Sequence, residues 1–373
     1  MQRANRFGDR GELISGSRGE VSFFGGKVSD ARMDIVRQSI PLVRAGWAGQ
    51  THVPDDVRAF IASLDLRGRP GVTSKEIATP IEQSFALNRD WDDRLSDASP
   101  RTEFPMIRHY TSDLGYSTLF TEINARYRSN AGTSDHRPFL PLTWLIELLN
   151  MELFAAARAD PARIGDRVVH RGTVFPGHLL DHYAMFEERE ARRENRSISI
   201  PLGLHSATGD KSIAQDFIRR NRPEDLGQED FGVIWTIHIV SLAGERLDLY
   251  HHHYPRSVVS SICATDISGL SSYKEAEVLL RGPFFEVLGF RPIDPIEGLP
   301  TYELHAVMLN SNRDHVSTYE LGDQDAPARE LFGKLIAAEK YAACAAVATS
   351  LDKGDLASQY SEAAKRAEEA VSA

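Results

Sequence analysis

Apolar residues recur at helical spacing in two segments that lie between residues 116 and 153. The first segment contains Tyr116, Leu119, Phe120, Ile123 and Tyr127, and the second contains Leu142, Leu145, Ile146, Leu149 and Leu153. Residues three and four positions apart share one face of an α-helix, so each segment presents an apolar stripe. We therefore predict two amphipathic helices that face a hydrophobic core, and their aromatic residues need no ligand to explain them.

Short apolar runs separated by polar turns dominate the chain after residue 166. These runs are Arg167–Arg171, Ser197–His205, Val233–Val240, Arg246–Tyr250, Glu277–Leu280, Phe284–Phe290 and Tyr302–Leu309. Many short strands of this kind predict antiparallel sheets rather than a doubly wound parallel sheet. No Gly-x-Gly-x-x-Gly motif follows a strand and no Walker loop occurs, so any dinucleotide would bind without a Rossmann fold.

The pattern divides the chain into residues 1–100, 101–310 and 311–373. Residues 1–30 are rich in Gly, Arg and Ser, and we expect them to be disordered. Helical fragments such as Asp56–Leu64 follow in this N-terminal region, whose role the sequence does not reveal. Residues 311–373 are predicted to be a linker followed by a C-terminal tail of two helices. The helices correspond to the Ala-rich segments Ala326–Ser350 and Lys353–Ala373, with Gly354 at the break between them.

Composition narrows the classes of protein that fit. The formal net charge of -10 argues against a nucleic-acid-binding protein, which would present a basic surface. Cys263 and Cys344 supply neither a disulfide framework nor a zinc site. No apolar run approaches the ~20 residues of a membrane span, so no membrane insertion is expected. Without a secretory signal the default location is the cytoplasm, and the same composition fits a protein exported by a non-Sec route or delivered to another cell.

Two acidic residues stand out because Glu275 and Glu277 lie two positions apart where a loop meets an apolar strand. On a strand they would share one face and repel each other, which suggests a use for the pair. The alternative is a strand edge kept soluble by charge. The run His251–His253 suggests a metal site, but adjacent histidines on an extended chain alternate faces, so we predict no metal.

Three segments taken in order resemble the arginine-specific mono-ADP-ribosyltransferases of the R-S-E class, which are NAD(P)+–protein-arginine ADP-ribosyltransferases. The segments are Val168–Thr173, with Arg171 before Gly172; Leu204–Phe217, with Ser206 in a Ser-Ala-Thr element; and Glu275–Leu280. Tyr110–Ser112, Tyr116 and Ile123–Asn124 are similar to the helical segment that precedes them in this family. The resemblance extends over about residues 106–310. Ala207 departs from the pattern, since the family has Thr at the centre of its Ser-Thr-Ser element.

This resemblance implies an α+β fold whose core has two packed antiparallel or mixed sheets, with N-terminal flanking helices and a helical C-terminal tail. It implies NAD as a substrate, no metal, and a partner protein with an accessible arginine. Arg171 would hold the pyrophosphate, Gly172 would offer its backbone to the nicotinamide amide, and Ser206 would orient Glu277. Glu277 would stabilise the transition state, and Glu275 would serve the acceptor arginine.

Several alternatives remain open on the sequence alone. Water as acceptor would make the protein an NAD glycohydrolase, a residue such as threonine could replace arginine, and an inactive fold would be an NAD-binding or interaction module. Taken singly, Arg171 is typical of a strand-end charge, and Thr208 or Asp210 of a helix cap. Phe217 is predicted to be core, and Phe231 is a candidate for stacking on nicotinamide.

Overall fold

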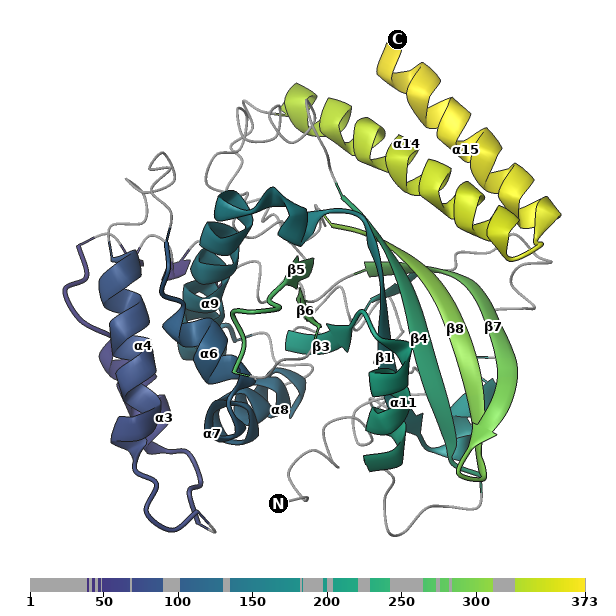
Figure 1. Ribbon diagram of the computed structural model, residues 1–373. Coiled ribbons are helices and arrows are strands. Elements are labelled where there is room, and N and C mark those ends of the chain that lie inside the picture. Colours follow the sequence, from purple (N-terminus) through teal and green to yellow (C-terminus); the bar gives the residue numbers. More distant parts are fainter. Residues whose placement is uncertain are drawn as a thin grey trace.

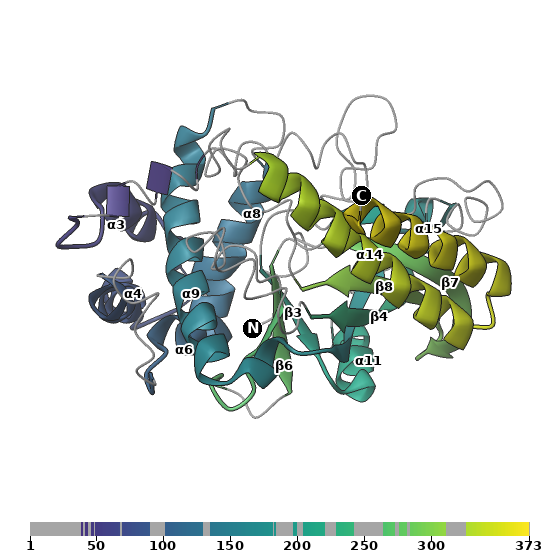
Figure 2. The same ribbon diagram turned by 90° about the horizontal axis from the view of Figure 1, so that it is seen from above.

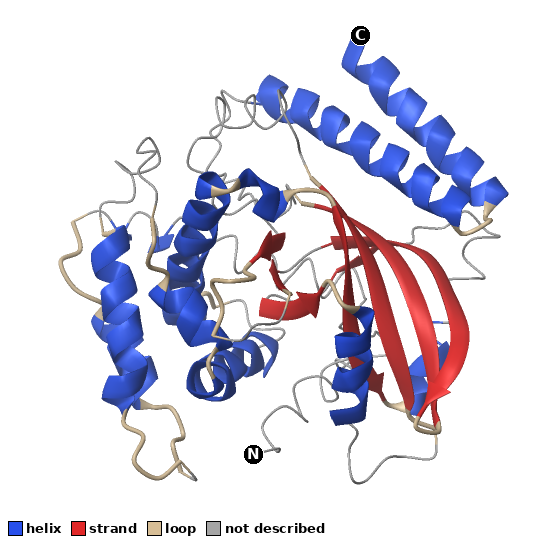
Figure 3. Ribbon diagram, viewed as in Figure 1, coloured by secondary structure: helices blue, strands red, loops and turns tan. Residues whose placement is uncertain are grey.

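The computed structural model has an α+β architecture in which helices flank a large curved sheet, as Figures 1 and 3 show. It describes Ser39 and residues 42–43, 46–47, 49–67, 69–89, 101–129, 135–181, 183, 197–199, 204–220, 229–241, 264–272, 276–281, 284–310 and 326–372. Glu275, Cys263, His251–His253, the run Arg246–Tyr250 and residues 1–38 lie outside the described residues. The predictions made for them stay predictions.

The described strands form one eight-stranded sheet in the order β2-β7-β8-β4-β1-β3-β6-β5. Their bounds are β1 Arg167–Phe175, β2 Ser197–Ser199, β3 Leu204–Thr208, β4 Phe231–Val240, β5 Ala264–Asp266, β6 Glu277–Arg281, β7 Phe284–Ile296 and β8 Leu299–Leu309. Neighbouring strands are antiparallel except β4 and β8, which run parallel. The prediction of a mainly antiparallel arrangement is confirmed.

The sheet is nearly divided where β1 meets β3. These two strands share the single Cα pair His170 and Thr208, whereas β1 pairs with β4 from Arg167 to Phe175. Figure 1 shows the short strands β3, β5 and β6 diverging from the long strands β1, β4, β8 and β7. The expected two packed sheets are not confirmed, because the pair at His170 keeps both parts in one hydrogen-bonded sheet.

The run Ser197–His205, predicted as one strand, is divided between two. Residues 197–199 form β2, which pairs with β7 at one edge of the sheet. Residues 204–208 form β3, which pairs with β6 and touches β1. Pro201 lies between the two strands in the sequence, and proline donates no hydrogen bond to a strand ladder. A single strand through this run would therefore lack one ladder bond at Pro201, a feature that the apolar pattern alone does not reveal.

A helical layer precedes the sheet in the chain. Its elements are α3 Asp55–Ala62, α4 Ser74–Asn88, α6 Pro105–Thr111, α7 Asp113–Gly115, the π-helix η1 Tyr116–Phe120, α8 Thr121–Ser129, the 3-10 helix η2 Arg137–Phe139, α9 Leu140–Ala159 and the 3-10 helix η3 Pro161–Ile164. Helix α9 contacts α3, α4 and α6, and Figure 2 shows this group gathered on one side of the molecule. Two further elements, η4 Gly177–Leu179 and α11 Lys211–Arg220, follow β1 and β3.

Both predicted apolar stripes contribute to the buried core, although Tyr116 at the start of the first is only partly buried. Leu119, Phe120 and Ile123 of the first stripe have no exposed surface, although the segment begins with a π-helical turn rather than an α-helix. In the second stripe, on α9, Leu142, Leu145, Ile146, Leu149 and Leu153 are all buried. Segments of π-helix occur often at functional sites. The one at Tyr116–Phe120 directly follows α6 and α7, next to the site described below.

Helix α9 is buried on nearly every side. The segment Arg137–Ala159 is long and apolar enough to cross a membrane, and 83% of its most apolar window is buried inside the protein. The prediction that no segment reaches this length and hydropathy is therefore wrong by these measures. Burial explains the composition, because a helix that is apolar all round is typical of a protein core.

One buried cluster joins the N-terminal region to the rest of the protein. It contains Trp47 and Phe85 from the first 100 residues, Trp144 from α9, and Leu204 and Leu279 from the sheet. The rings of Trp47 and Trp144 are stacked with their centroids 4.8 Å apart. The boundary at residue 100 stays a prediction, but α3 and α4 share their hydrophobic core with the elements that follow.

The C-terminal tail forms the two predicted helices, α14 Ala326–Ser350 and α15 Gly354–Ser372. They lie against each other over the β7 and β8 end of the sheet (Figure 2). Tyr360 of α15 donates a hydrogen bond of 2.6 Å to Glu286 of β7, and Lys340 of α14 lies 3.2 Å from the same carboxylate. The hairpin is thus attached to the sheet by buried polar contacts as well as by apolar packing.

Candidate functional site

The structure brings Arg171, Ser206 and Glu277 together from three neighbouring strands, β1, β3 and β6. Glu277 begins β6 opposite Thr208 of β3, and Ser206 lies two residues before Thr208. Paired residues share a face and so do residues two apart, so Ser206 and Glu277 project to the same side. The distance between their side chains confirms this, since Ser206 Oγ donates to Glu277 Oε1 at 2.6 Å.

Tyr110 of α6 completes a chain of hydrogen bonds with these two residues. Its hydroxyl oxygen lies 3.0 Å from Ser206 Oγ. A serine hydroxyl has one proton, and Ser206 gives it to the carboxylate, so Tyr110 is the donor to Ser206. Burial, with Tyr116 and Glu277 nearby, raises the pKa of Tyr110 well above its ordinary value, which keeps this donor protonated.

Arg171 contacts the same serine through the backbone. Its Nη1 donates a hydrogen bond of 2.7 Å to the main-chain carbonyl of Ser206. Pairing between β1 and β3 ends at His170, and a carbonyl at such a place needs a partner other than the next strand. The guanidinium supplies that partner. One consequence is that a cation is fixed beside Ser206 where the two parts of the sheet diverge.

Gly172 is required by packing. A Cβ at this position would overlap the main-chain carbonyl oxygen of Ala214 and would lie 3.0 Å from Ile218 Cγ1, both on α11. Helix α11 therefore rests directly on the β1 backbone. The sequence suggested that a glycine here leaves its backbone accessible to a ligand. The structure gives a different reason for the glycine, namely the close approach of the helix that follows Ser206.

Asn124 of α8 holds the start of β3. Its side-chain amide donates to the Leu204 carbonyl at 3.2 Å and accepts from the Leu204 amide at 3.1 Å. These two bonds imitate a strand partner for Leu204, two residues before Ser206. Asn124 belongs to the helical segment that resembles the family, but the sequence predicted no role for it.

The segment before Glu277 is also fixed by hydrogen bonds. The Ala276 carbonyl accepts from the Gly209 amide at 3.0 Å, and the Glu277 carbonyl accepts from the Ile267 amide at 2.9 Å. Further back, Ser272 bonds twice to the end of α6. Glu275 itself is outside the described part of the chain, but the described residues on both sides of it are tied to the rest of the protein.

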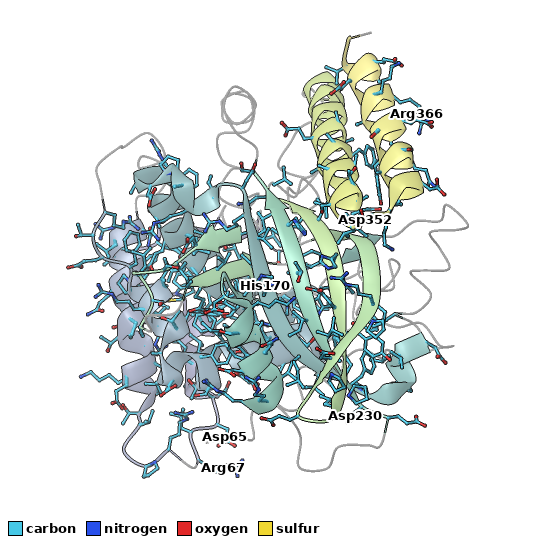
Figure 4. All side chains as sticks on the ribbon, turned by 45° about the vertical axis from the view of Figure 1, so that its right-hand side comes forward. Asp65, Arg67, His170, Asp230, Asp352 and Arg366 are labelled. Atoms are coloured by element: carbon cyan, nitrogen blue, oxygen red, sulfur yellow. The ribbon has the colours of Figure 1, made fainter. Side chains whose placement is uncertain are left out.

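A second polar cluster lies on the face of the sheet beside α11. Its member His170, labelled in Figure 4, has Nδ1 3.2 Å from Thr236 Oγ1. Glu303 of β8 is buried and accepts from Thr236 at 2.9 Å and from Lys211 at 2.5 Å. Arg291 donates to its other oxygen at 2.9 Å, and His305 Nε2 lies 3.3 Å from that oxygen. His305, then Lys211 and Arg291, hold the pKa of Glu303 well below its ordinary range against the effect of burial.

Phe231, Phe217 and Asp210, which the sequence also singled out, have structural roles or lie on the surface. Phe231 is buried between Phe175 and Tyr302, with ring centroids 5.9 and 5.7 Å away, so it is a core residue and not a ring available to nicotinamide. Phe217 is 40% exposed on α11, which contradicts its prediction as core. Asp210 caps α11 by accepting a hydrogen bond of 2.8 Å from the Ser212 amide, which confirms the alternative that Asp210 is a helix cap.

The sequence predicted neither the contact between Tyr110 and Ser206 nor a role for the buried Glu152. Tyr110 lies within a segment that resembles the family, but its contact with Ser206 was not predicted, because a contact across 96 residues leaves no local signal. The sequence predicted no role for Glu152 of α9, although a carboxylate within so apolar a helix is unusual. Among the described residues no group of three or more His, Cys, Asp or Glu is placed to hold a metal.

No protein-family model and no curated protein matches the chain. It is similar to the solved structure of the ADP-ribosyltransferase HopU1 of Pseudomonas syringae pv. tomato DC3000, with 18% identity and a TM-score of 0.36 over 67% of this chain and 95% of that one. It is also similar to the Vis toxin, an ADP-ribosyltransferase from Vibrio splendidus, with 10% identity and a TM-score of 0.27 over 80% and 89%. A third similarity is to the enzymatic component C2-I of the Clostridium botulinum C2 toxin, with 14% identity and a TM-score of 0.34 over 62% and 47%. At such identities and TM-scores, the function has to be inferred from the site's own residues.

Proposed function

We propose that this chain is a mono-ADP-ribosyltransferase that moves ADP-ribose from NAD to an arginine side chain of a protein and releases nicotinamide. The observation that supports the proposal best is the meeting of Arg171, Ser206 and Glu277. Three strands supply one residue each, and the contacts are 2.7 Å from Arg171 Nη1 to the Ser206 carbonyl and 2.6 Å from Ser206 Oγ to Glu277. A cation, a hydroxyl and a carboxylate so arranged suit the two ends of a dinucleotide.

Glu277 would act on the sugar. Breaking the bond between nicotinamide and ribose leaves the electron pair on the nicotinamide nitrogen and develops positive charge on the ribose. A carboxylate already fixed in place stabilises that charge without reorganising during the reaction. Ser206 is the residue that fixes it, because its hydrogen bond defines the direction in which one carboxylate oxygen points.

Arg171 would hold the pyrophosphate. A guanidinium is permanently charged and presents a planar set of five donors, which suits phosphate oxygens. Charge-assisted hydrogen bonds of this kind are about twice as strong as neutral ones. The bond from Nη1 to the Ser206 carbonyl orients the guanidinium and connects the pyrophosphate end of the site to the residue that orients Glu277.

Glu275 would serve the acceptor. The guanidinium of a substrate arginine has a pKa above about 12, so it must be positioned and must lose a proton as its nitrogen bonds to the ribose carbon. A neighbouring carboxylate can orient it and accept that proton. The resemblance to the arginine-specific ADP-ribosyltransferases is the basis for giving Glu275 this role, since it stands two residues before Glu277 as the first acid of their Glu-x-Glu pair does.

Incubating the folded protein with labelled NAD and an arginine-rich acceptor protein tests the proposal. The wild type is expected to transfer label and to release nicotinamide, and Glu277→Gln is expected to lose roughly 100-fold or more in both, the size of effect seen when one charge-stabilising group is removed. Glu82→Gln, an exposed carboxylate on α4, is the matched control and should be unchanged. A folded wild type that neither transfers label nor releases nicotinamide would reject the proposal.

The role of Glu275 is tested separately by Glu275→Gln. This variant is expected to lose transfer to arginine while it keeps most of the nicotinamide release, since water can still react with the ribose. Arginine transfer at the wild-type rate would show that Glu275 has another function. Nicotinamide release without transfer in the wild type would instead identify an NAD glycohydrolase.

A further inference from the structure

Glu152 is a buried carboxylate that holds the beginning of α6. It lies on α9 with no exposed surface. Its Oε1 accepts from the Met106 amide at 3.1 Å, and its Oε2 accepts from the Ile107 amide at 3.0 Å. Ser84 of α4 donates a third hydrogen bond of 2.5 Å to Oε1. Burial raises the pKa of Glu152 to about 7, which these three donors partly oppose.

Helix α6 lacks a cap of its own. The residue before it, Phe104, makes no side-chain hydrogen bond to the first turn, and Pro105 occupies the first helical position without an N–H group. The next two amides, those of Met106 and Ile107, would be buried without acceptors if Glu152 were absent. A carboxylate from another helix therefore caps the N-terminus of α6, as a local Ser, Thr, Asp or Asn side chain does in most helices.

The anchor extends into the N-terminal region. Asn88 of α4 donates to Ser84 Oγ at 3.2 Å and to the Ser84 carbonyl at 2.8 Å. Arg101 in turn donates to Asn88 Oδ1 at 2.7 Å. Ser84 and Asn88 are both buried. Helix α4, whose role the sequence left open, thus contributes polar groups that keep the Glu152 carboxylate in place.

The other end of α6 reaches the candidate site in two directions. Tyr110 donates to Ser206. Thr111 Oγ1 accepts from the Ser272 amide at 2.8 Å, and the Arg108 carbonyl accepts from Ser272 Oγ at 2.9 Å. Since the helix has seven residues, its anchored start and these contacts are separated by only about 10 Å. One short helix therefore touches both Ser206 and the loop that leads toward Glu277.

We propose that Glu152 is a positioning residue: by holding the start of α6, it fixes Tyr110 against Ser206 and fixes Ser272 before Glu277. This inference rests on the proposed function, since it assigns Glu152 an effect on the reaction through other residues. Glu152 touches neither Ser206 nor Glu277, and a loss of its charge would reach them only through a shift of α6.

Glu152→Gln is the direct test, with Glu147→Gln as its matched control. Glutamine keeps the size of the side chain but turns one oxygen into an NH2 group, so one of the two backbone amides loses its acceptor. Glu147 is also buried on α9, and it accepts from Asn150 of the same helix. We expect Glu152→Gln to lower kcat for NAD cleavage about tenfold, equivalent to 1.36 kcal/mol of barrier, with KM for NAD within about twofold. Glu147→Gln should leave kcat unchanged. An unchanged kcat in Glu152→Gln, or an equal loss in Glu147→Gln, would overturn the proposal.

Hydrogen exchange tests the same link without depending on activity. In Glu152→Gln the amides of Met106, Ile107 and Ser272 should exchange faster by about tenfold, while those of α15 should not change. Faster exchange confined to Met106 and Ile107 would show that α6 does not transmit the change, and would overturn the proposal. If the wild type fails to cleave NAD, the proposed function fails, and this measurement still decides whether Glu152 positions Ser272.

A second variant covers the case in which Glu152→Gln does not fold. Ser272 is exposed, so Ser272→Ala removes the bond to the Arg108 carbonyl without opening the core. We expect faster exchange in residues 267–272, normal protection of Met106 and Ile107, and a kcat lowered without a change in KM for NAD. An unchanged kcat together with unchanged exchange in the loop would count against the proposal.

Discussion

The hydrogen bond between Tyr110 and Ser206 predicts that Tyr110→Phe lowers the free energy of unfolding in the wild type but raises it when Ser206 is replaced by Ala. Tyr110→Phe in the wild type removes one hydroxyl but preserves the packing of the ring, whose centroid lies 4.8 Å from that of Phe120. The loss is one neutral hydrogen bond, so the free energy of unfolding should fall by about 1 kcal/mol. Ser206 keeps its donation to Glu277 in this variant.

In a Ser206→Ala background the same substitution should have the opposite effect. Tyr110 has no exposed surface, so removing Ser206 Oγ leaves its hydroxyl buried and unpaired, at a cost of roughly 1–3 kcal/mol. Replacing Tyr110 by Phe then removes that cost and should raise the free energy of unfolding by about 1 kcal/mol. The coupling between the two positions is the difference, about 2 kcal/mol, which lies within the range known for residues in contact.

Equilibrium urea unfolding of the wild type, both single variants and the double variant measures this coupling, and NAD cleavage by the same four proteins measures its effect on the reaction. Ser206→Ala removes a hydrogen bond to a charged group, about 1.5–3 kcal/mol, so kcat/KM should fall roughly 10- to 150-fold. Adding Tyr110→Phe to it should cost no further activity. Additive effects on both stability and activity would refute the idea that Tyr110 acts through Ser206.

Three other predictions follow from packing and from titration. Gly172→Ala forces a Cβ into the Ala214 carbonyl, and overpacking of this kind costs about 1–3 kcal/mol. The melting temperature should therefore fall by roughly 5 °C in a thermal unfolding experiment. An unchanged melting temperature would mean that α11 moves away freely. The pKa of Glu152 is raised on folding from 4.5 to about 7, so the folded state binds this proton more tightly than the unfolded chain does. The free energy of unfolding should therefore decline by about 3 kcal/mol as the pH rises from 4.5 to 7, at 1.36 kcal/mol per unit of pKa. Urea unfolding of Glu152→Gln should lack this dependence on pH. Burial lowers the pKa of His170 and of His238 below the ordinary 6.5, and the charges of Lys211 and His305 lower them further, respectively. The folded state therefore resists protonation, and stability should fall as the pH drops below 6.5. A His170→Gln/His238→Gln variant whose melting temperature falls as steeply with acid as that of the wild type would contradict this.

The sequence was informative wherever a residue type and its neighbours on the same strand carry the signal. Apolar runs predicted the strands that bear Arg171 and Glu277, and helical spacing predicted the buried stripes that include Leu119 and Leu145. The order of the motifs predicted that Arg171, Ser206 and Glu277 belong to one site. These are local properties, and local properties survive in a linear pattern.

Contacts between distant segments were not predictable in the same way. Tyr110 and Ser206 are 96 residues apart, and Glu152 and Met106 are 46 residues apart. Their pairing depends on how α6 packs between α9 and the sheet, which no spacing along the chain reveals. Phe231 was misjudged for a related reason, since a strand aromatic has the same appearance in a sequence whether it faces a ligand or, as here, Phe175 and Tyr302.

Strand connections were predictable only in part. The run that became β2 and β3 alternates as one strand would, yet its two parts pair with β7 and with β6. The single pair between His170 and Thr208 is a property of the register, and register follows from the whole sheet rather than from one strand. This near division places Arg171 beside Ser206, so the feature that shapes the candidate site is also one the sequence did not show.

Calorimetric titration with NAD tests most directly whether the three residues form one dinucleotide site. The wild type should bind NAD, and Arg171→Ala should bind it at least tenfold more weakly, the change expected when one charge-assisted contact is lost. Arg219→Ala, which removes an exposed arginine paired with Asp216 on α11, should bind as the wild type does. Equal affinity in folded wild type and Arg171→Ala, or no binding by the wild type, would contradict the account.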